Sequence, residues 1–248
     1  MTTAILSALP EEQEGLAAMM DGARTLRHAG RDFHLGHWQG MPVVFALSRI
    51  GKVAAATTAA ALVDRFGVQR IIFTGVAGGL HPEVQVGDTV VATDFLQHDM
   101  DASPLFPRHE IPLYGRSRFP ADVALADHLF AACSELAEGA GPDQATRDRF
   151  KLHRMRVHRG LLVSGDRFVS SLGESEALQS ALPDALAVDM EAAAVAQVCH
   201  DHGIPFAAIR HISDRADDAA HVDFPAYLQA VAAGQARAVI TRFLRVLA

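Results

Sequence analysis

Polar residues that could do chemistry gather in short clusters, each of which follows an apolar run typical of a buried strand. The clusters are PEE at 10–12, TGVAGG at 74–79, SGDRF at 164–168, and DME with RHISD at 189–191 and 210–214. In a layered α/β sheet, ligands bind in the crevice beyond the carboxyl ends of the strands. The pattern therefore predicts one crevice that combines carboxylates, glycines and an aromatic ring, a set suited to acid–base chemistry on a small molecule.

The acidic residues are the candidates for proton transfer. Glu11, Glu12 and Glu14 stand where a helix is predicted to begin, so they either stabilise the positive end of that helix or one of them points into the crevice as a general base. Asp214 follows the last apolar position of its strand; it is either an ordinary turn aspartate or a buried acid whose pKa is raised by desolvation. Asp189 and Glu191 precede an alanine-rich run, where they either cap a helix or face a bound polar group.

The glycines and one phenylalanine are candidates for ligand contact. TGVAGG is neither a dinucleotide fingerprint nor a Walker loop. It is either a tight strand-to-helix turn or a place where the backbone at Val76 and Gly78 approaches a ligand closely. Phe168 is either a core residue or a ring that stacks on a planar ligand.

Other chemistries have no signal in the chain. The 13 histidines form no HExxH or Cys/His ligand spacing, so we expect no metal and no cofactor. Asp99 lies in QHDMD at 97–101, which imitates a metal cluster, but we expect this segment to order a loop. No GxSxG elbow is present, and neither cysteine lies in a catalytic signature.

The bulk properties narrow the class of protein. The chain has 248 residues, half of them apolar, and a net charge of −7, which argues against nucleic-acid or polybasic membrane partners. Its two cysteines, far apart in sequence, indicate a reducing compartment. The N-terminal segment lacks a basic region and no apolar run reaches the length of a membrane span. We therefore expect a cytoplasmic protein.

Strand-like and helix-like runs alternate along the chain, which predicts an α/β layered fold with a buried sheet, formed by one domain over 1–248. Expected strands lie at 3–9, at 33–48 as a hairpin, and at 70–75, 87–101, 155–165, 185–190 and 204–214. Expected helices lie at 10–20, 52–66, 121–137, 191–202 and 225–248. The proline-rich stretch 102–120 should be a long ordered loop, and 138–150 a polar surface connection.

Taken in order, these clusters resemble the purine nucleoside phosphorylase/hydrolase superfamily and, within it, the 5′-methylthioadenosine/S-adenosylhomocysteine nucleosidases. The resemblance rests on ALPEEQEGL, SRIGKVAAA, TGVAGGL, VGDTVVATDFLQHD, RGLLVSGDRF, AVDMEAAAVAQVCHDHGIPF and RHISDRADDAAHVDF. The stretches 104–118 and 139–154 are not covered. The resemblance implies a three-layer α/β/α fold with a central mixed, twisted β-sheet.

The resemblance also implies roles for the three carboxylates. Asp214 matches the acid that protonates N7 of the adenine leaving group. Glu12 matches the carboxylate that orients and deprotonates the attacking water. Glu191, helped by Met190, matches the residue that holds the ribose hydroxyls. An acid on the leaving group and a base on the water resemble the pair of an inverting glycosidase.

Further site residues follow from the same resemblance. Phe168 should stack on the purine, and the backbone of Val169 should read the edge of the base. Arg210 and Ser213 together should position the sugar side and the catalytic aspartate. The alkylthio pocket should be lined by Leu9, Ile50 and Phe224.

The sequence departs from the family pattern at several positions. Val76 replaces a common Ser or Thr, Leu9 a methionine, Asp189 a glutamate and His211 a small residue. These changes bear on substrate preference more than on reaction type. Because Asp189 stands where the family has a glutamate, we assign it no chemistry and expect it to be structural or helix-capping.

The resemblance implies hydrolysis of 5′-methylthioadenosine, with S-adenosylhomocysteine as a second substrate to be tested, by a homodimer whose 102–119 loop either reaches the partner or packs on its own domain. The alternatives are a nucleosidase for aminodeoxyfutalosine or for a nucleotide, a phosphorylase of the same fold, and a non-catalytic nucleoside-binding protein. The acidic LPEE segment disfavours the phosphorylase, because like charge repels phosphate.

Overall fold

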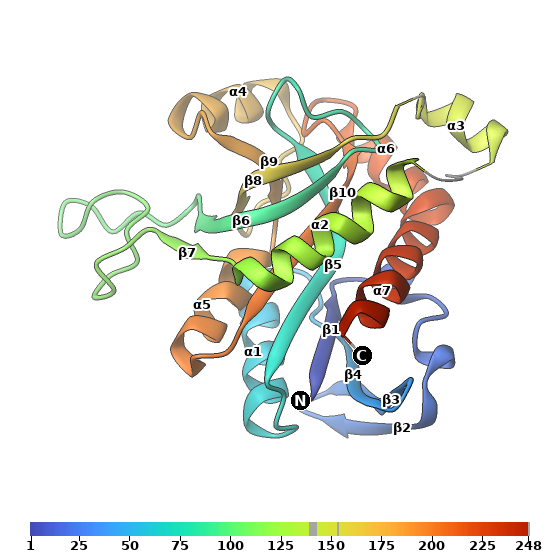
Figure 1. Cartoon of the computed structure of the whole chain (residues 1–248). Coiled ribbons are helices and arrows are strands. Elements are labelled where there is room, and N and C mark those ends of the chain that lie inside the picture. The colour runs from blue at the N-terminus through green and yellow to red at the C-terminus, as the bar shows by residue number, and fades with distance from the viewer. Residues whose placement is uncertain (139–142, 153, 248) are drawn as a thin grey trace.

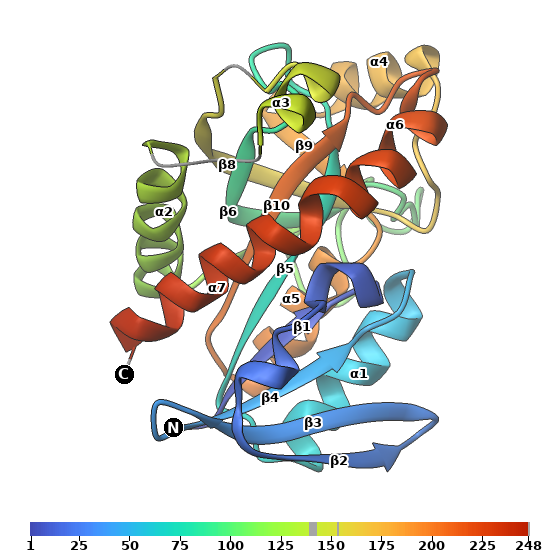
Figure 2. The same ribbon diagram turned by 90° about the vertical axis from the view of Figure 1, so that its right-hand side faces the viewer.

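The computed structural model describes residues 1–138, 143–152 and 154–247, and its strands form one mixed sheet with helices on both faces (Figures 1 and 2). The strands are β1 (Thr3–Ser7), β2 (Asp21–His28), β3 (Arg31–Trp38), β4 (Met41–Leu47), β5 (Arg70–Gly79), β6 (Thr89–Gln97), β7 (Arg118–Pro120), β8 (Val157–Ser164), β9 (Ala185–Asp189) and β10 (Phe206–Asp214). The helices are α1 (Lys52–Asp64), α2 (Val123–Glu138), α3 (Gln144–Phe150), α4 (Leu172–Ala181), α5 (Ala192–His202), α6 (Ala220–Tyr227) and α7 (Ala233–Leu247).

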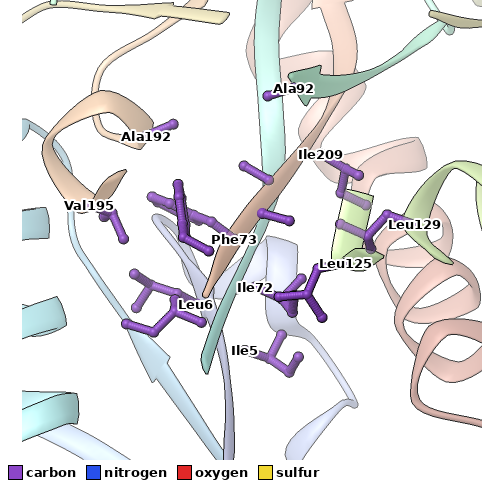
Figure 3. Close-up of a cluster of buried hydrophobic side chains, with 14 of the residues drawn as sticks. Ile5, Leu6, Ile72, Phe73, Ala92, Leu125, Leu129, Ala192, Val195 and Ile209 are labelled. Atoms are coloured by element: carbon purple, nitrogen blue, oxygen red, sulfur yellow. The ribbon is translucent and has the colours of Figure 1, made fainter. Parts of the chain in front are cut away.

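The layers match the predicted three-layer architecture. Helices α1 and α5 pack together on one face of the sheet, and α2 and α7 pack together on the other (Figure 1). Successive side chains of a strand point to opposite faces, so neighbouring residues of one strand serve both layers. Ile72 lies toward Leu125 of α2, while Phe73 lies toward Val195 of α5 (Figure 3).

Half of the sheet closes on itself. The strand order is β10-β6-β8-β9-β5-β1-β4-β3-β2, and β10 also pairs with β5 in parallel. Strands β5, β9, β8, β6 and β10 therefore form a ring. Near its carboxyl end, β5 pairs with β9 at Gly78 and Gly79 and with β10 at Asp214, where the register shifts between Ile212 and Asp214.

The glycine-rich segment 74–79 is part of a strand and does not form the tight strand-to-helix turn that was one of its two interpretations. β5 runs through TGVAGG to Gly79 and no helix follows it. The glycines are needed because other groups come close to the strand. A Cβ on Gly75 would lie 2.7 Å from Glu12 Oε1, and a Cβ on Gly78 would lie 3.0 Å from Asp214 Oδ1.

The helix expected at 10–20 is absent, and this prediction was wrong. Two short 3₁₀ turns, Pro10–Gln13 and Ala17–Met19, take its place. Gly15 between them has φ +79°, which is outside the helical region. Gln13 is drawn to the sheet instead, where its Nε2 donates to the carbonyls of Ile5 (3.0 Å) and Ala46 (2.9 Å).

The remaining differences concern exposed elements. Strand β2 was not expected, and all of its residues are exposed. Helix α4 was also missed; Ser171 caps it by accepting from the N–H of Glu174. The polar connection predicted over 138–150 contains α3, and its residues 139–142 lie outside the described part of the chain. The expected C-terminal helix is continuous from α6 to α7 through a π-helical segment, Leu228–Ala232.

The proline-rich stretch is a long loop, as predicted. Between β6 and β7 the chain extends away from the body of the molecule (Figure 1), with one isolated bridge between Ile111 and Arg116. Leu105 and Leu113, at 84% and 91% exposure, contact little of their own domain.

Candidate active site

A cavity of about 340 Å³ lies where the carboxyl ends of β1, β5, β8, β9 and β10 meet. All the predicted site residues except Arg210 and Ser213 line it. They are Leu9, Glu12, Ile50, Val76, Gly78, Phe168, Val169, Met190, Glu191, Asp214 and Phe224. The strand ends thus bring together residues more than 200 positions apart in sequence.

Glu12 is buried and held by backbone amides. Its Oε2 accepts from the N–H groups of Ala8 (2.8 Å) and Leu9 (2.9 Å), and its Oε1 accepts from that of Val76 (3.0 Å). Burial raises the pKa of Glu12, while the charge of Arg210 and the three amides act in the opposite direction. The result is a rigidly oriented carboxylate with enhanced basicity, which suits a general base.

Glu191 lies at the start of α5 and faces the same cavity. Its Oε1 accepts from the N–H of Gly51 (2.9 Å). Burial, reinforced by the nearby charge of Asp189, raises the pKa of Glu191 to about 8. Gly51 is the one donor to this carboxyl group among the residues that the structure describes, so acceptor positions are left for a hydroxylated ligand.

Asp189, two residues earlier, has a structural environment. It forms an ion pair with Arg210 (Oδ2 to the terminal nitrogen, 2.8 Å) and accepts from the hydroxyl of Ser164. It also accepts from the N–H groups of Glu191 (3.2 Å) and Ala192 (3.3 Å), which begin α5. Asp189 therefore caps the helix that presents Glu191, as expected, although one side of it also lines the cavity.

Arg210 differs from its predicted role. Its side chain is 1% exposed and does not line the cavity. It donates to Asp189 and to the carbonyls of Ile209 and Phe73, and its guanidinium lies 4.1 Å from the Phe73 ring centroid. Arg210 therefore does not touch the sugar side. It lies behind the site, where its positive charge lowers the pKa of Glu12 and Glu191.

Asp214 reaches the cavity from the end of β10. Its Oδ1 accepts from the N–H of Ala216 (2.8 Å) and its Oδ2 accepts from the hydroxyl of Ser213 (2.8 Å). Burial raises the pKa of Asp214 despite these two hydrogen bonds. Ser213 lies behind the cavity wall and orients Asp214, as predicted for the residue that positions this aspartate.

An aromatic pair also lines the cavity. Phe168 and Phe224 meet edge to face with ring centroids 5.7 Å apart. Phe168 is 40% exposed, so it is not a core residue. Together with Ile50, which is 54% exposed, these rings leave apolar surface available to a planar, partly apolar ligand.

A polar network outside the cavity ties two of its loops together. The ammonium of Lys52 lies 2.5 Å from Asp99 Oδ1, and Asp166 accepts from the N–H of Lys52 (2.7 Å). Asp99 also accepts from the N–H of Asp166 (2.9 Å). The network joins the segment that carries Gly51 to the segment that carries Phe168. The QHDMD segment therefore orders loops, as expected.

Sequence reasoning missed several residues of the site. Ala8, Ala77, Arg167 and Val188 also line the cavity, and Arg167 forms an exposed ion pair with Glu174. Small and apolar wall residues carry no signal in sequence. The Asp189–Arg210 ion pair was not predicted either, because the two residues lie on different strands, β9 and β10.

Two further observations concern other kinds of function. Within the described ranges, no group of three His, Cys, Asp or Glu side chains is placed to hold a metal ion. Among the same residues, no helix is both long enough and apolar enough to span a membrane.

The sheet, its two helical layers and a strand-end cavity with three buried carboxylates define an α/β protein of the phosphorylase type. In agreement, the family model of the phosphorylase superfamily matches residues 2–245. The 5′-methylthioadenosine/S-adenosylhomocysteine nucleosidase of Chromohalobacter salexigens is 35% identical over 237 residues, which are 95% of this chain and 94% of that protein.

Solved structures agree. The 5′-methylthioadenosine/S-adenosylhomocysteine nucleosidase of Neisseria meningitidis, in complex with methylthio-immucillin-A, superposes with a TM-score of 0.86 at 32% identity over 99% of both chains. The futalosine hydrolase of Helicobacter pylori superposes with a TM-score of 0.83 at 31% identity over 98% of this chain and 97% of that one. The chain belongs to the phosphorylase superfamily and, within it, to the 5′-methylthioadenosine/S-adenosylhomocysteine nucleosidase family.

Proposed function

We propose that this protein hydrolyses the N-glycosidic bond of 5′-methylthioadenosine, and also that of S-adenosylhomocysteine, to release adenine and a 5-thio-substituted ribose. The observation that carries the proposal is the arrangement of Glu12, Glu191 and Asp214 around one cavity, each held by different hydrogen bonds. The family membership of the chain supports the same activity.

Asp214 is proposed as the general acid. Departure of adenine places negative charge on the base, which a proton delivered to N7 neutralises. An acid must be protonated to do this near neutral pH, and burial of Asp214 raises its pKa in that direction. The hydroxyl of Ser213 and the N–H of Ala216 fix its orientation.

Glu12 is proposed as the general base. Loss of adenine leaves oxocarbenium character on the ribose, and a water must lose a proton as it attacks. The three amide donors fix the carboxylate in one orientation. They also favour its ionised form, which is the form that accepts a proton.

Glu191 and the aromatic wall are proposed to bind the substrate. Vicinal ribose hydroxyls would donate to Glu191, whose Oε1 has Gly51 as its protein donor. Phe168 would stack on the adenine, and Leu9, Ile50 and Phe224 would contact the 5′-alkylthio group. A substrate that lacks a hydroxyl would leave a buried acceptor unpaired and so be discriminated against.

The activity is tested by incubating the protein with 5′-methylthioadenosine in phosphate-free buffer and measuring free adenine. We expect release by the wild-type chain and by Gly173→Ala, whose new methyl group meets no atom within 4 Å. Glu12→Gln and Asp214→Asn should each lose a factor of about 10² to 10⁴ in kcat. Release that requires phosphate would instead identify a phosphorylase, and no release would support a non-catalytic binding protein.

A second candidate substrate is favoured by one comparison. The futalosine hydrolase of Helicobacter pylori shares the fold over nearly the full chain. A panel that includes 5′-methylthioadenosine, S-adenosylhomocysteine and aminodeoxyfutalosine, compared by kcat/KM, separates the two activities. The apolar surfaces of Ile50, Phe168 and Phe224 favour the alkylthio substrates in this competition.

We further propose that the chain forms a homodimer in the cytoplasm. The loop between β6 and β7 extends from the body with Leu105 and Leu113 exposed, and a second chain would bury these apolar side chains. Cys133 and Cys199 are both free and buried, which agrees with a reducing compartment. Sedimentation velocity at several protein concentrations tests the dimer, and a monomer at all of them would contradict it.

A further inference from the structure

A second cavity, of about 270 Å³, lies on the other side of the sheet from α5. Its walls come from α2, α3, α7 and the π-helical segment before α7, from the start of β6, from the residues just before β8 and from β10. Figure 2 shows α2 and α7 on this face. The cavity shares no lining residue with the substrate cavity among the residues that the structure describes.

The lining of this cavity is mostly apolar. Its apolar side chains include Cys133, Leu136, Met155, Val231 and Val239, which are buried or partly buried, while Thr89, Thr146 and Gln235 add polar groups. The charged lining residues Asp143 and Arg156 are exposed and carry opposite charges. Such a lining favours an uncharged, largely apolar molecule, because a charged ligand would lose its hydration without a matching partner.

His211 adds one buried polar group to this lining. The side chain comes from β10 and is 2% exposed. Its Nδ1 shares a hydrogen bond with the hydroxyl of Thr89 (2.9 Å), whereas Nε2 has no hydrogen-bond partner among the described residues. Buried polar atoms without a partner are rare in native proteins and require an explanation. A bound molecule with one hydrogen-bonding group would supply that partner.

The charge state of His211 agrees with a neutral ligand. Burial, helped by the positive charge of Arg210, lowers the pKa of His211 to about 4. The imidazole is therefore neutral at pH 7, with one nitrogen as donor and the other as acceptor. It can exchange a hydrogen bond with a hydroxyl or amide group, but it offers no positive charge to an anion.

The local backbone also leaves room at this cavity. Ala230 and Val231 lie in the π-helical segment, and Gly234 lies one turn further on. Short π-helical segments occur frequently at functional sites. A Cβ on Gly234 would meet no atom within 4 Å, so a larger side chain there can enter free space without displacing its neighbours.

We propose that this cavity is a second binding site, independent of the substrate cavity, for an uncharged and mostly apolar small molecule that exchanges one hydrogen bond with His211. A bicyclic phenol has the required chemistry, because its ring system is apolar and its hydroxyl group both donates and accepts.

The probe for the test is 2-naphthol, titrated into the full chain labelled with ¹³C-methyl methionine. Met155 lines the second cavity and Met190 the substrate cavity, so each methyl signal reports on one site. The signals are assigned with Met155→Leu and Met190→Leu. We expect a saturable shift of the Met155 signal. Naphthalene, which lacks the hydroxyl, should bind about tenfold more weakly, in line with the loss of one hydrogen bond.

Variants connect the shift to the proposed contacts. His211→Phe keeps a ring but removes its nitrogens and should weaken 2-naphthol about tenfold. Gly234→Leu should fill the cavity and abolish the shift, and Ala230→Leu serves the same purpose if that variant does not fold. Gly173→Leu is the matched control, because a Cβ there also meets nothing within 4 Å and the residue does not line the cavity.

Three results would overturn the proposal. They are an unmoved Met155 signal, equal affinity for naphthalene and 2-naphthol, and a Met155 shift that survives the filling variants. None of these readouts depends on catalysis, so they are separate from the test of the proposed nucleosidase activity.

Discussion

Replacing Asp189 by asparagine tests the ion pair that lies beneath the substrate cavity. The carboxylate of Asp189 accepts from two nitrogens of Arg210, from the Ser164 hydroxyl and from the first amides of α5. An asparagine retains one acceptor oxygen. Its amide group would turn two further N–H donors toward a region that already contains a guanidinium and several donors.

The size of the effect follows from burial. The side chains of Arg210 and Asp189 are 1% and 2% exposed, so the guanidinium that remains has no access to bulk water. Removing one partner of such a buried pair costs about 3–5 kcal/mol in the free energy of unfolding. Asp184→Asn is the matched control, because Asp184 also pairs with two nitrogens of an arginine but is 55% exposed. That change should cost about 0–1 kcal/mol.

Urea unfolding followed by circular dichroism, at one protein concentration, measures both variants. The double variant Asp189→Asn with Arg210→Met should recover part of the loss, because it removes the unpaired charge. A loss for Asp189→Asn no larger than that for Asp184→Asn would refute the reasoning. So would a double variant less stable than the sum of the single ones.

Three further changes test separate features. The pKa of Glu191 rises from 4.5, its ordinary value, to about 8 in the folded protein, so between these pH values the folded protein holds a proton that the unfolded chain has lost. The free energy of unfolding should therefore fall as pH rises through this window, and it should fall less steeply in Glu191→Gln. Urea titrations at each pH measure both slopes. Gly75→Ala places a methyl group 2.7 Å from Glu12 Oε1 and should reduce kcat at least about tenfold, unlike Gly173→Ala. Gly234→Ala adds a methyl group in open space within α7 and should raise the unfolding free energy by about 0.5–1 kcal/mol in urea. An unchanged pH slope, an active Gly75→Ala or a destabilised Gly234→Ala would contradict these accounts.

The buried strands could be predicted from the sequence because their two covered faces require unbroken apolar runs. Strand β2 could not, since all its residues are exposed and it is held by backbone pairing with β3 and by exposed side-chain contacts such as Thr25–His34. Helix α4 did carry a signal, the Ser171 cap three residues before Glu174. The helix expected after Pro10 failed because Gln13 and Glu12 bond to the sheet and to loop amides, contacts that no local pattern contains.

The positions of the carboxylates could also be predicted, because each follows a strand whose end points into the crevice. The position of the Arg210 side chain could not be predicted. Simple alternation puts Arg210 and Asp214 on the same face of β10, but the register shift between Ile212 and Asp214 changes the phase of the strand. The arginine is therefore directed to Asp189, while the aspartate reaches the cavity.

The closed half of the sheet bears on how the protein avoids aggregation. A strand in a ring has its backbone groups paired on both sides and cannot recruit a strand from another molecule. Among the described residues, this leaves β2 and the three-residue β7 at the margins of the sheet. β7 contains Pro120, and β2 carries Arg24 and Arg27 on a fully exposed strand. Proline and charge are the usual deterrents to intermolecular strand pairing, so the closure that assembles the site also leaves few places for misassembly.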